Sequence, residues 1–231
     1  MCVAKGRTIQ EVIKKIKTGD TLMVGGFGLI GSPLTLIDGL TKHSVTDLTI
    51  ISNNLGEAGE GLGLVLRQGK IKKAIGSYFT SNREAVQFYN DGNLAIELVP
   101  QGTMSEALRA GGAGIGGFYT KTAVGTELAK GKETKVIDGE TYLLEKALKA
   151  DVALIRALKA DTKGNLIYYK TARNFNPNMA TAARFVIAEV DEIVEEGELS
   201  PEEIVTPHLF VDAIVKSKRI LTNKGVVERE D

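Results

Sequence analysis

Two glycine clusters contain the residues best suited to approach a ligand. Residues 25–31 read Gly-Gly-Phe-Gly-Leu-Ile-Gly, and residues 111–117 read Gly-Gly-Ala-Gly-Ile-Gly-Gly. Glycine lets the backbone bend sharply, and free N–H groups at the start of a helix can hold an anion or a developing oxyanion. Tight turns between packed elements would explain the same glycines without a ligand. We favour ligand contact for the first cluster and leave both explanations open for the second.

Amide side chains follow two of the expected strands. Asn53 and Asn54 come directly after an apolar run at residues 48–51, and Gln101 comes after another at residues 94–99. Ligands of parallel α/β sheets bind beyond the carboxyl ends of the strands, which is where these three amides fall. Each of them could instead be a hydrogen-bonded turn residue.

The spacing Gly26-x-Gly28-x-x-Gly31 matches the dinucleotide fingerprint, so a Rossmann-type NAD(P)-dependent oxidoreductase is an alternative. That fold places an acidic residue at the end of the second strand to hold the ribose hydroxyls. Asn53 and Asn54 occupy this place instead, and Gly112-x-Gly114-x-x-Gly117 repeats the spacing with no helix evident after it. We therefore disfavour the oxidoreductase.

The remaining polar residues suggest structural roles. A single cysteine, Cys2, excludes an internal disulfide, and the sequence shows no metal cluster and no Ser-His-Asp arrangement. The acidic run at residues 189–203 has the composition of a solvated face. The segment 173–177, Arg-Asn-Phe-Asn-Pro, is interpreted as a buried hydrogen-bonded turn or a wall of a site, with the structural role favoured.

The elements that would position the clusters alternate between strand and helix. We expect a helix over residues 8–17, a strand over 21–24, a helix capped by Ser32 with Pro33 as its first residue, and a strand over 48–51. Further strands are expected over residues 71–75, 94–99, 152–155, 166–169 and 185–188. Helices are expected over 83–89 and 105–109, and Asp138-Gly139 predicts a hairpin. The predicted fold class is α/β, an open, mostly parallel sheet with helices on both faces plus a small antiparallel excursion.

Composition places limits on the class of protein. Lys plus Arg and Asp plus Glu number 29 each, so no overall field favours nucleic acid or an anionic membrane. No apolar run approaches the roughly 20 residues that span a bilayer, and the start lacks the core of a secretory signal, so we expect a cytoplasmic protein. We expect one domain over residues 1–215 and a polar, partly disordered tail over residues 216–231.

Six segments in order resemble the α subunit of the family I coenzyme A transferases, which act on 3-oxoacids, acetate, butyrate and acetoacetate. They are Gly19-Asp20 with Val24-Gly-Gly-Phe-Gly-Leu-Ile-Gly-Ser-Pro33, Ser52-Asn-Asn54, Glu97-Leu-Val-Pro-Gln-Gly-Thr103, Arg109-Ala-Gly-Gly-Ala-Gly-Ile-Gly-Gly-Phe-Tyr119, Leu158-Lys-Ala-Asp161 through Gly164-Asn165, and Thr171-Ala-Arg-Asn-Phe-Asn-Pro177. The resemblance extends over residues 8–215.

The resemblance implies an enzyme that moves CoA from an acyl-CoA to a short-chain carboxylic or 3-oxo acid through a glutamyl-CoA intermediate. The family's glutamate lies on the β subunit in a Ser-Glu-Asn-Gly context, which this sequence lacks, so the chain would be active only with that partner, in an α2β2 assembly. CoA is a substrate, and no metal or other cofactor is implied. A metabolite-sensing module without catalysis is a further alternative.

The same resemblance assigns roles to particular residues. Gln101 would donate a hydrogen bond to the acyl carbonyl or carboxylate, and Phe27 would close its loop against apolar neighbours. Asn53, Asn54, Gly112 and Gly114 would shape the pocket. The residues that would contact CoA are Gly25, Gly26, Phe27, Gly28, Leu29, Ile30 and Gly31.

Overall fold

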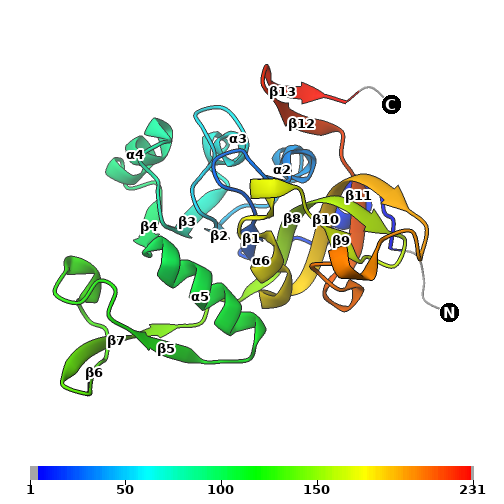
Figure 1. The fold of residues 1–231 in the computed structure, drawn as a ribbon. Coiled ribbons are helices and arrows are strands. Elements are labelled where there is room, and N and C mark those ends of the chain that lie inside the picture. Colours follow the sequence, from blue (N-terminus) through cyan, green and yellow to red (C-terminus); the bar gives the residue numbers. More distant parts are fainter. Residues whose placement is uncertain (1–4, 230–231) are drawn as a thin grey trace.

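The computed structural model describes residues 5–229, so Cys2 lies outside the described residues. A central sheet has the strand order β11-β10-β8-β1-β2-β3-β4, in which all neighbours are parallel, and β9 pairs antiparallel with β8 (Figure 1). The strands of this sheet are β1 (Thr21–Val24), β2 (Leu48–Ile51), β3 (Ile71–Gly76), β4 (Ala95–Leu98), β8 (Ala150–Asp161), β9 (Leu166–Ile167), β10 (Ala183–Val194) and β11 (Ala213–Lys216). The predicted open parallel sheet is confirmed.

Helices cover both faces of the sheet because successive strand side chains point to opposite sides. Leu22 and Val24 pack in a core with the first four helices, whereas Met23 packs in a second core with the last two. The helices are α1 (Ile9–Ile13), α2 (Leu34–Thr41), α3 (Leu62–Arg67), α4 (Arg83–Asn90), α5 (Gln101–Gly112) and α6 (Asn176–Ala182), with short 3-10 turns at Glu127–Ala129, Lys170–Arg173, Pro201–Glu203 and His208–Phe210. None of the helices in residues 5–229 is long and apolar enough to cross a membrane.

The strand order reverses between β1 and β8. The chain runs outward from β1 through β2 and β3 to β4, and later returns to place β8 on the other side of β1. Such a switch point leaves a crevice at the carboxyl ends of the two strands, where open α/β sheets bind their ligands. The first glycine cluster follows β1 directly and therefore lies at this crevice.

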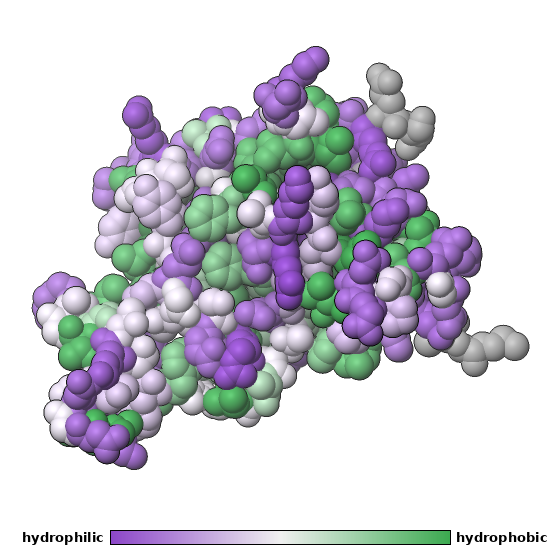
Figure 2. All heavy atoms as spheres, in the orientation of Figure 1, coloured by the Kyte–Doolittle hydropathy of each residue, from purple (hydrophilic) through white to green (hydrophobic). Residues whose placement is uncertain are grey.

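A three-stranded antiparallel sheet is inserted between α5 and β8. Its strands are β5 (Gly117–Thr120), β6 (Thr134–Ile137) and β7 (Glu140–Lys146), and it projects from the body as an arm (Figure 1). Asp138 and Gly139 both have positive φ, 49° and 80°, as a tight hairpin turn between β6 and β7 requires. Hydrophilic and hydrophobic residues are mixed over the arm's surface (Figure 2). The expected antiparallel excursion is confirmed.

The end of the chain differs from our expectation. Residues 219–228 form a hairpin of β12 (Arg219–Thr222) and β13 (Gly225–Glu228), where we predicted a polar, partly disordered tail. Bonds to the body hold its start, since the N–H groups of Lys218 and Arg219 both donate to Thr35 Oγ1 at 2.9 Å. Alternating apolar residues in two four-residue strands were too short a signal for a sequence-based prediction.

Some helix boundaries also differ. α1 ends at Ile13 rather than at residue 17, and α5 runs from Gln101 to Gly112 rather than over residues 105–109. α2 begins at Leu34, and its N-cap is Pro33 without a side-chain hydrogen bond, so the predicted Ser32 cap is wrong. Another group satisfies the N–H groups of this helix, and it belongs to the site.

Candidate active site

The first glycine cluster forms a tight loop at the carboxyl end of β1. Gly25 donates its N–H to Leu154 O on β8 at 3.0 Å, and Phe27 and Ile30 exchange backbone hydrogen bonds of 2.9 and 3.2 Å. At Gly26 the backbone φ is 127°, a conformation that residues with side chains rarely adopt. The loop of residues 25–31, here called the glycine loop, therefore doubles back on itself at the switch point.

The tip of the glycine loop carries exposed apolar side chains. Phe27 is 50% exposed and Ile30 is 48% exposed, whereas Leu29 is buried. The prediction that Phe27 closes the loop against apolar neighbours is wrong, because half of its surface remains open. A phenylalanine in this position has a large apolar area available for contact with a ligand or another chain.

Few N–H groups of the glycine loop are available to a ligand. Gly26 donates to Asn174 Oδ1 at 3.1 Å, and Gly25, Phe27 and Ile30 donate to backbone carbonyls. The N–H groups without an acceptor among residues 5–229 are those of Gly28, Leu29 and Gly31. Any anion or oxyanion contact by this backbone would use these three donors.

The N-terminus of α2 is not a free anion site. Thr35 and Leu36 donate their N–H groups to Glu189 Oε2 at 2.8 and 3.1 Å. A carboxylate of the protein thus occupies the place that we expected a ligand to take at the start of this helix. The expectation that the helix contributes free N–H groups is wrong.

Glu189 lies in the middle of β10 and is fully buried. Its Oε1 accepts a bond from Arg156 Nη1 at 2.6 Å. Burial raises the pKa of Glu189, against the opposing effects of Arg156 and the α2 backbone. We placed Glu189 on a solvated acidic face, which is wrong. The signal that could have located it is the buried apolar run that continues on both sides, through Ala188 and Val190.

Two of the predicted amides meet at the carboxyl ends of β2 and β4. Asn53 Nδ2 donates to Ser77 Oγ at 2.7 Å and to Gln101 Oε1 at 3.3 Å. Gln101 is exposed at the first residue of α5, so it is a helix residue rather than the turn residue we expected. Because Oε1 accepts the bond from Asn53, the Gln101 NH2 group is the half of the amide left to donate to a ligand.

Asn54 joins the glycine loop at a small cleft. Its buried side chain accepts a bond from Gly56 N at 3.1 Å, and Ser52 Oγ donates to its carbonyl oxygen at 2.5 Å. The residues that line this cleft include Gly25, Gly26, Gly28, Ser32 and Asn54. The structure thus brings Asn54 together with the predicted loop.

The second glycine cluster lies elsewhere. Gly112 is the last residue of α5, and a Cβ there would come within 2.0 Å of Thr181 Oγ1, so this glycine allows α5 to pack on α6. Gly114 has φ of 73° just beyond the helix end, with open space around it. Neither glycine lines the clefts on the two sides of the glycine loop.

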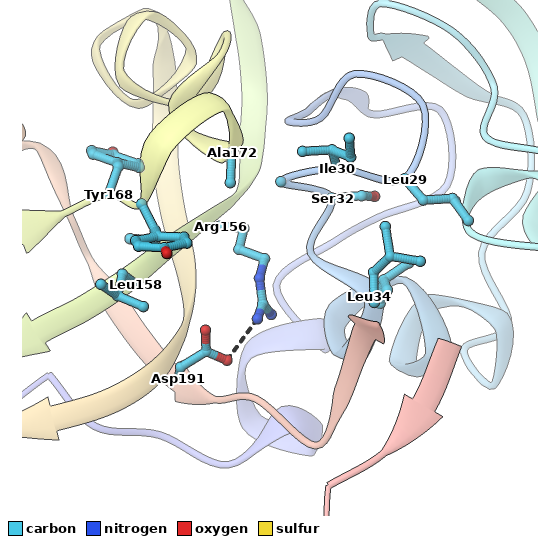
Figure 3. Close-up of a pocket in the computed structure, with 13 residues that line it drawn as sticks. Leu29, Ile30, Ser32, Leu34, Arg156, Leu158, Tyr168, Ala172 and Asp191 are labelled. Carbon is cyan, nitrogen blue, oxygen red and sulfur yellow. Dashed lines mark hydrogen bonds and ion pairs between the residues drawn. The ribbon is translucent and has the colours of Figure 1, made fainter. Parts of the chain in front are cut away.

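A wider cleft of about 240 Å³ opens on the other side of the loop (Figure 3). Leu29, Ile30 and Gly31 form one wall. Arg156 lies across from it and pairs with Asp191 at 2.6 Å (Figure 3). Because Arg156 binds both Glu189 and Asp191, carboxylates of the protein already neutralise its charge. Sequence reasoning did not find this cleft.

No group of three or more His, Cys, Asp or Glu side chains within residues 5–229 is arranged to hold a metal ion. The polar groups at the crevice are amides and backbone N–H donors, which suit an uncharged carbonyl or a carboxylate.

A family model described as Coenzyme A transferase matches residues 7–217. The chain belongs to this family. A Bacillus subtilis relative, named as the first of the two subunits of a probable succinyl-CoA:3-ketoacid coenzyme A transferase, is 53% identical over 206 residues, 89% of this chain and 87% of the relative. The alpha subunit of acetate CoA-transferase from Escherichia coli K12 is 46% identical over 211 residues, 91% of this chain and 96% of the relative.

The fold of this coenzyme A transferase chain is also found in solved structures. An acyl-CoA transferase from E. coli O157:H7, in a thioester complex with CoA, superposes with a TM-score of 0.81 at 22% identity, over 93% of this chain and 47% of that chain. This likeness concerns the fold alone. The oxidoreductase and metabolite-sensing alternatives gain no support from the family model or from these relatives.

Proposed function

We propose that this chain is the α subunit of an enzyme that moves CoA from an acyl-CoA donor to a short-chain carboxylic or 3-oxo acid. The observation that carries the proposal is its 53% identity, over 89% of the chain, to the corresponding subunit of a probable succinyl-CoA:3-ketoacid transferase. The relative named for acetate, at 46% identity, supports the wider class of short-chain acids as acceptors.

The geometry of the crevice suits such a substrate. The thioester would lie against the glycine loop, where the N–H groups of Gly28, Leu29 and Gly31 have no acceptor in the described part of the chain. Gln101, oriented by Asn53, would donate its NH2 group to the acyl carbonyl or to the acid's carboxylate. Donors that are fixed before the reaction stabilise developing charge without reorganising during it.

The nucleophile would come from the partner. A glutamate carboxylate of the β subunit would attack the thioester carbon, the C–S bond would break, and an acyl-glutamyl anhydride and CoA thiolate would result. The thiolate then attacks the glutamyl carbonyl, which releases the donor's acid and leaves a glutamyl-CoA thioester. The acceptor carboxylate attacks this thioester, and the returning thiolate takes the new acyl group. The atoms and charges balance with CoA as substrate, so we propose no further cofactor.

The relatives named above are subunits of larger enzymes, so a second kind of subunit is expected for this chain. We propose an α2β2 assembly and a cytoplasmic location. The mass of the co-purified complex tests the assembly directly.

Activity with and without the partner tests the function. The chain is purified alone and together with the β subunit encoded beside it, and transfer from acetyl-CoA or succinyl-CoA to acetoacetate or butyrate is followed. We expect turnover only with both subunits. After incubation with acyl-CoA, intact-mass measurement should show that the β subunit has gained the mass of CoA minus water and that this chain has not.

Two results would contradict the proposal. Turnover by this chain alone would place the nucleophile within it. The complete absence of transfer by the assembled complex, with all of these donor and acceptor pairs, would reject the transferase function.

A further inference from the structure

The segment Arg-Asn-Phe-Asn-Pro at residues 173–177 contacts the glycine loop from about 145 positions along the chain. It lies between the 3-10 turn Lys170–Arg173 and α6. This segment forms the buried hydrogen-bonded turn that its sequence suggested. Its two asparagines do more than stabilise the turn, because both reach across to the loop.

Asn174 ties the two ends of the glycine loop together. Its Oδ1 accepts the N–H of Gly26 at 3.1 Å, and its Nδ2 donates to the carbonyl of Ile30 at 3.0 Å. One amide therefore satisfies a donor where the loop begins and an acceptor where the loop ends. An amide group is suited to this task because it offers both functions on one rigid plane.

Asn176 fixes the base of the loop to β8. Its Nδ2 donates to Gly31 O at 3.0 Å, and its Oδ1 accepts the N–H of Arg156 at 2.9 Å. The side chain is fully buried. A Cβ on Gly25 would lie 1.8 Å from this Oδ1, so the loop packs against the amide too closely for any side chain there.

The backbone at Asn174 is strained. Its φ is 23° and its ψ is −119°, which is an unusual conformation for a residue with a side chain. Such a conformation costs about 1–3 kcal/mol and persists where the surrounding structure enforces it, often at functional sites. Here it is the conformation in which the side chain meets both ends of the loop.

We propose that Asn174 and Asn176 are positioning residues for CoA transfer. Together they clamp both ends of the glycine loop, so that the exposed tip and the N–H groups of Gly28 and Leu29 are held in place for the thioester. The proposal rests on the proposed function, because it assigns to this loop the binding of acyl-CoA. Neither asparagine is proposed to touch the reacting atoms.

The test separates the clamp from the strain. Asn174→Gly removes both side-chain bonds but leaves a residue that tolerates the backbone conformation, so the fold is expected to persist. Hydrogen exchange of the Gly26 amide in the chain alone reports the clamp. Steady-state kinetics of the assembled enzyme report its effect on the reaction.

We expect the Gly26 amide of Asn174→Gly to exchange at least about tenfold faster, since its acceptor is gone. In the complex with the β subunit, kcat should fall by about 10–100-fold, more than KM changes, because a misplaced loop is felt most in the transition state. The matched control is Asn178→Ala on α6, whose amide makes a long contact of 3.5 Å with Ser105 O. It should leave both readouts unchanged.

Unaltered Gly26 exchange in Asn174→Gly would overturn the clamp, and altered exchange with unaltered kinetics would overturn its role in the reaction. If Asn174→Gly fails to fold, Asn174→Ser serves in its place, because a hydroxyl is too short to bind both ends of the loop. A wild-type complex without transferase activity would reject the proposed function, while the exchange experiment would still test the clamp in the chain alone.

Discussion

At the level of single residues, the contact between Asn53 and Gln101 bears most directly on the chemistry. The 3.3 Å bond orients the Gln101 amide so that its donor half is free. Asn53 is itself held, since it is buried and also donates to Ser77. A donor whose orientation is set before the substrate arrives is the kind of group that stabilises a developing oxyanion.

Replacing Gln101 with alanine should lower kcat of the assembled enzyme by about 10²–10³-fold with little change in KM, as expected for the loss of one preorganised donor. Steady-state kinetics with acyl-CoA as the varied substrate measure this. Glu106→Gln on the same helix is the control, because Glu106 pairs with Arg109 on the surface of α5. A raised KM with unchanged kcat would instead show that Gln101 binds substrate and transition state equally.

Gly25→Ala tests the close approach of the loop to Asn176. The added Cβ would overlap Asn176 Oδ1, so we expect the free energy of unfolding to fall by about 1–3 kcal/mol. Urea unfolding of the isolated chain measures the change. Gly116→Ala is the control, since its Cβ would meet no atom of the described residues within 4 Å, and it should change stability by less than about 0.5 kcal/mol. Equal effects would argue against the packing.

Among the helices and strands, Glu189 joins α2 to β10. The helix would otherwise begin with unsatisfied N–H groups inside the core, because its N-cap residue Pro33 provides no side-chain hydrogen bond. The carboxylate from β10 accepts two of these N–H groups and is in turn paired with Arg156 on β8. Three elements therefore depend on one buried charge.

Glu189→Ala should destabilise the chain by about 3–5 kcal/mol, since it removes a buried partner of Arg156 and leaves two buried N–H groups without an acceptor. Glu192→Ala is the matched control on the same strand. Glu192 makes a more exposed pair with Lys159 at 2.6 Å, and its loss should cost at most about 1 kcal/mol. Urea unfolding of both variants measures the difference, and similar losses would show that Glu189 has no special role.

Over the whole molecule, the C-terminal hairpin fastens to the body through contacts far apart in sequence. Arg219 pairs with Asp38 at 3.3 Å, and Arg229 pairs with Asp191 at 3.3 Å. Its strands β12 and β13 form a separate two-stranded sheet beside the central one. The hairpin should therefore contribute to stability without determining the fold.

Ending the chain after Lys218 should lower the free energy of unfolding by about 1–3 kcal/mol, the sum of a few hydrogen bonds and exposed ion pairs. The far-UV circular dichroism of the central fold should persist. Arg219→Ala, which removes the pair with Asp38, should have a smaller effect. Loss of the folded state on truncation would show that the hairpin is required for the fold.

Local sequence patterns were enough to predict the α/β class, the parallel sheet, the antiparallel arm and the place of the glycine loop. Apolar periodicity and turn residues such as Asp138-Gly139 act within a few residues of the chain, so they can be read without a structure. The family resemblance that includes Gln101 and the loop was likewise legible, because its motifs are continuous in sequence.

Which groups of the site are free became known from the folded chain. Glu189 occupies the start of α2, Asn174 takes the N–H of Gly26, and Asn53 orients Gln101. These partners lie 48 to 154 positions apart in the chain. A hydrogen bond satisfies its donor whatever the distance along the sequence, so neighbouring residue types cannot show whether a donor in the loop remains available to a ligand.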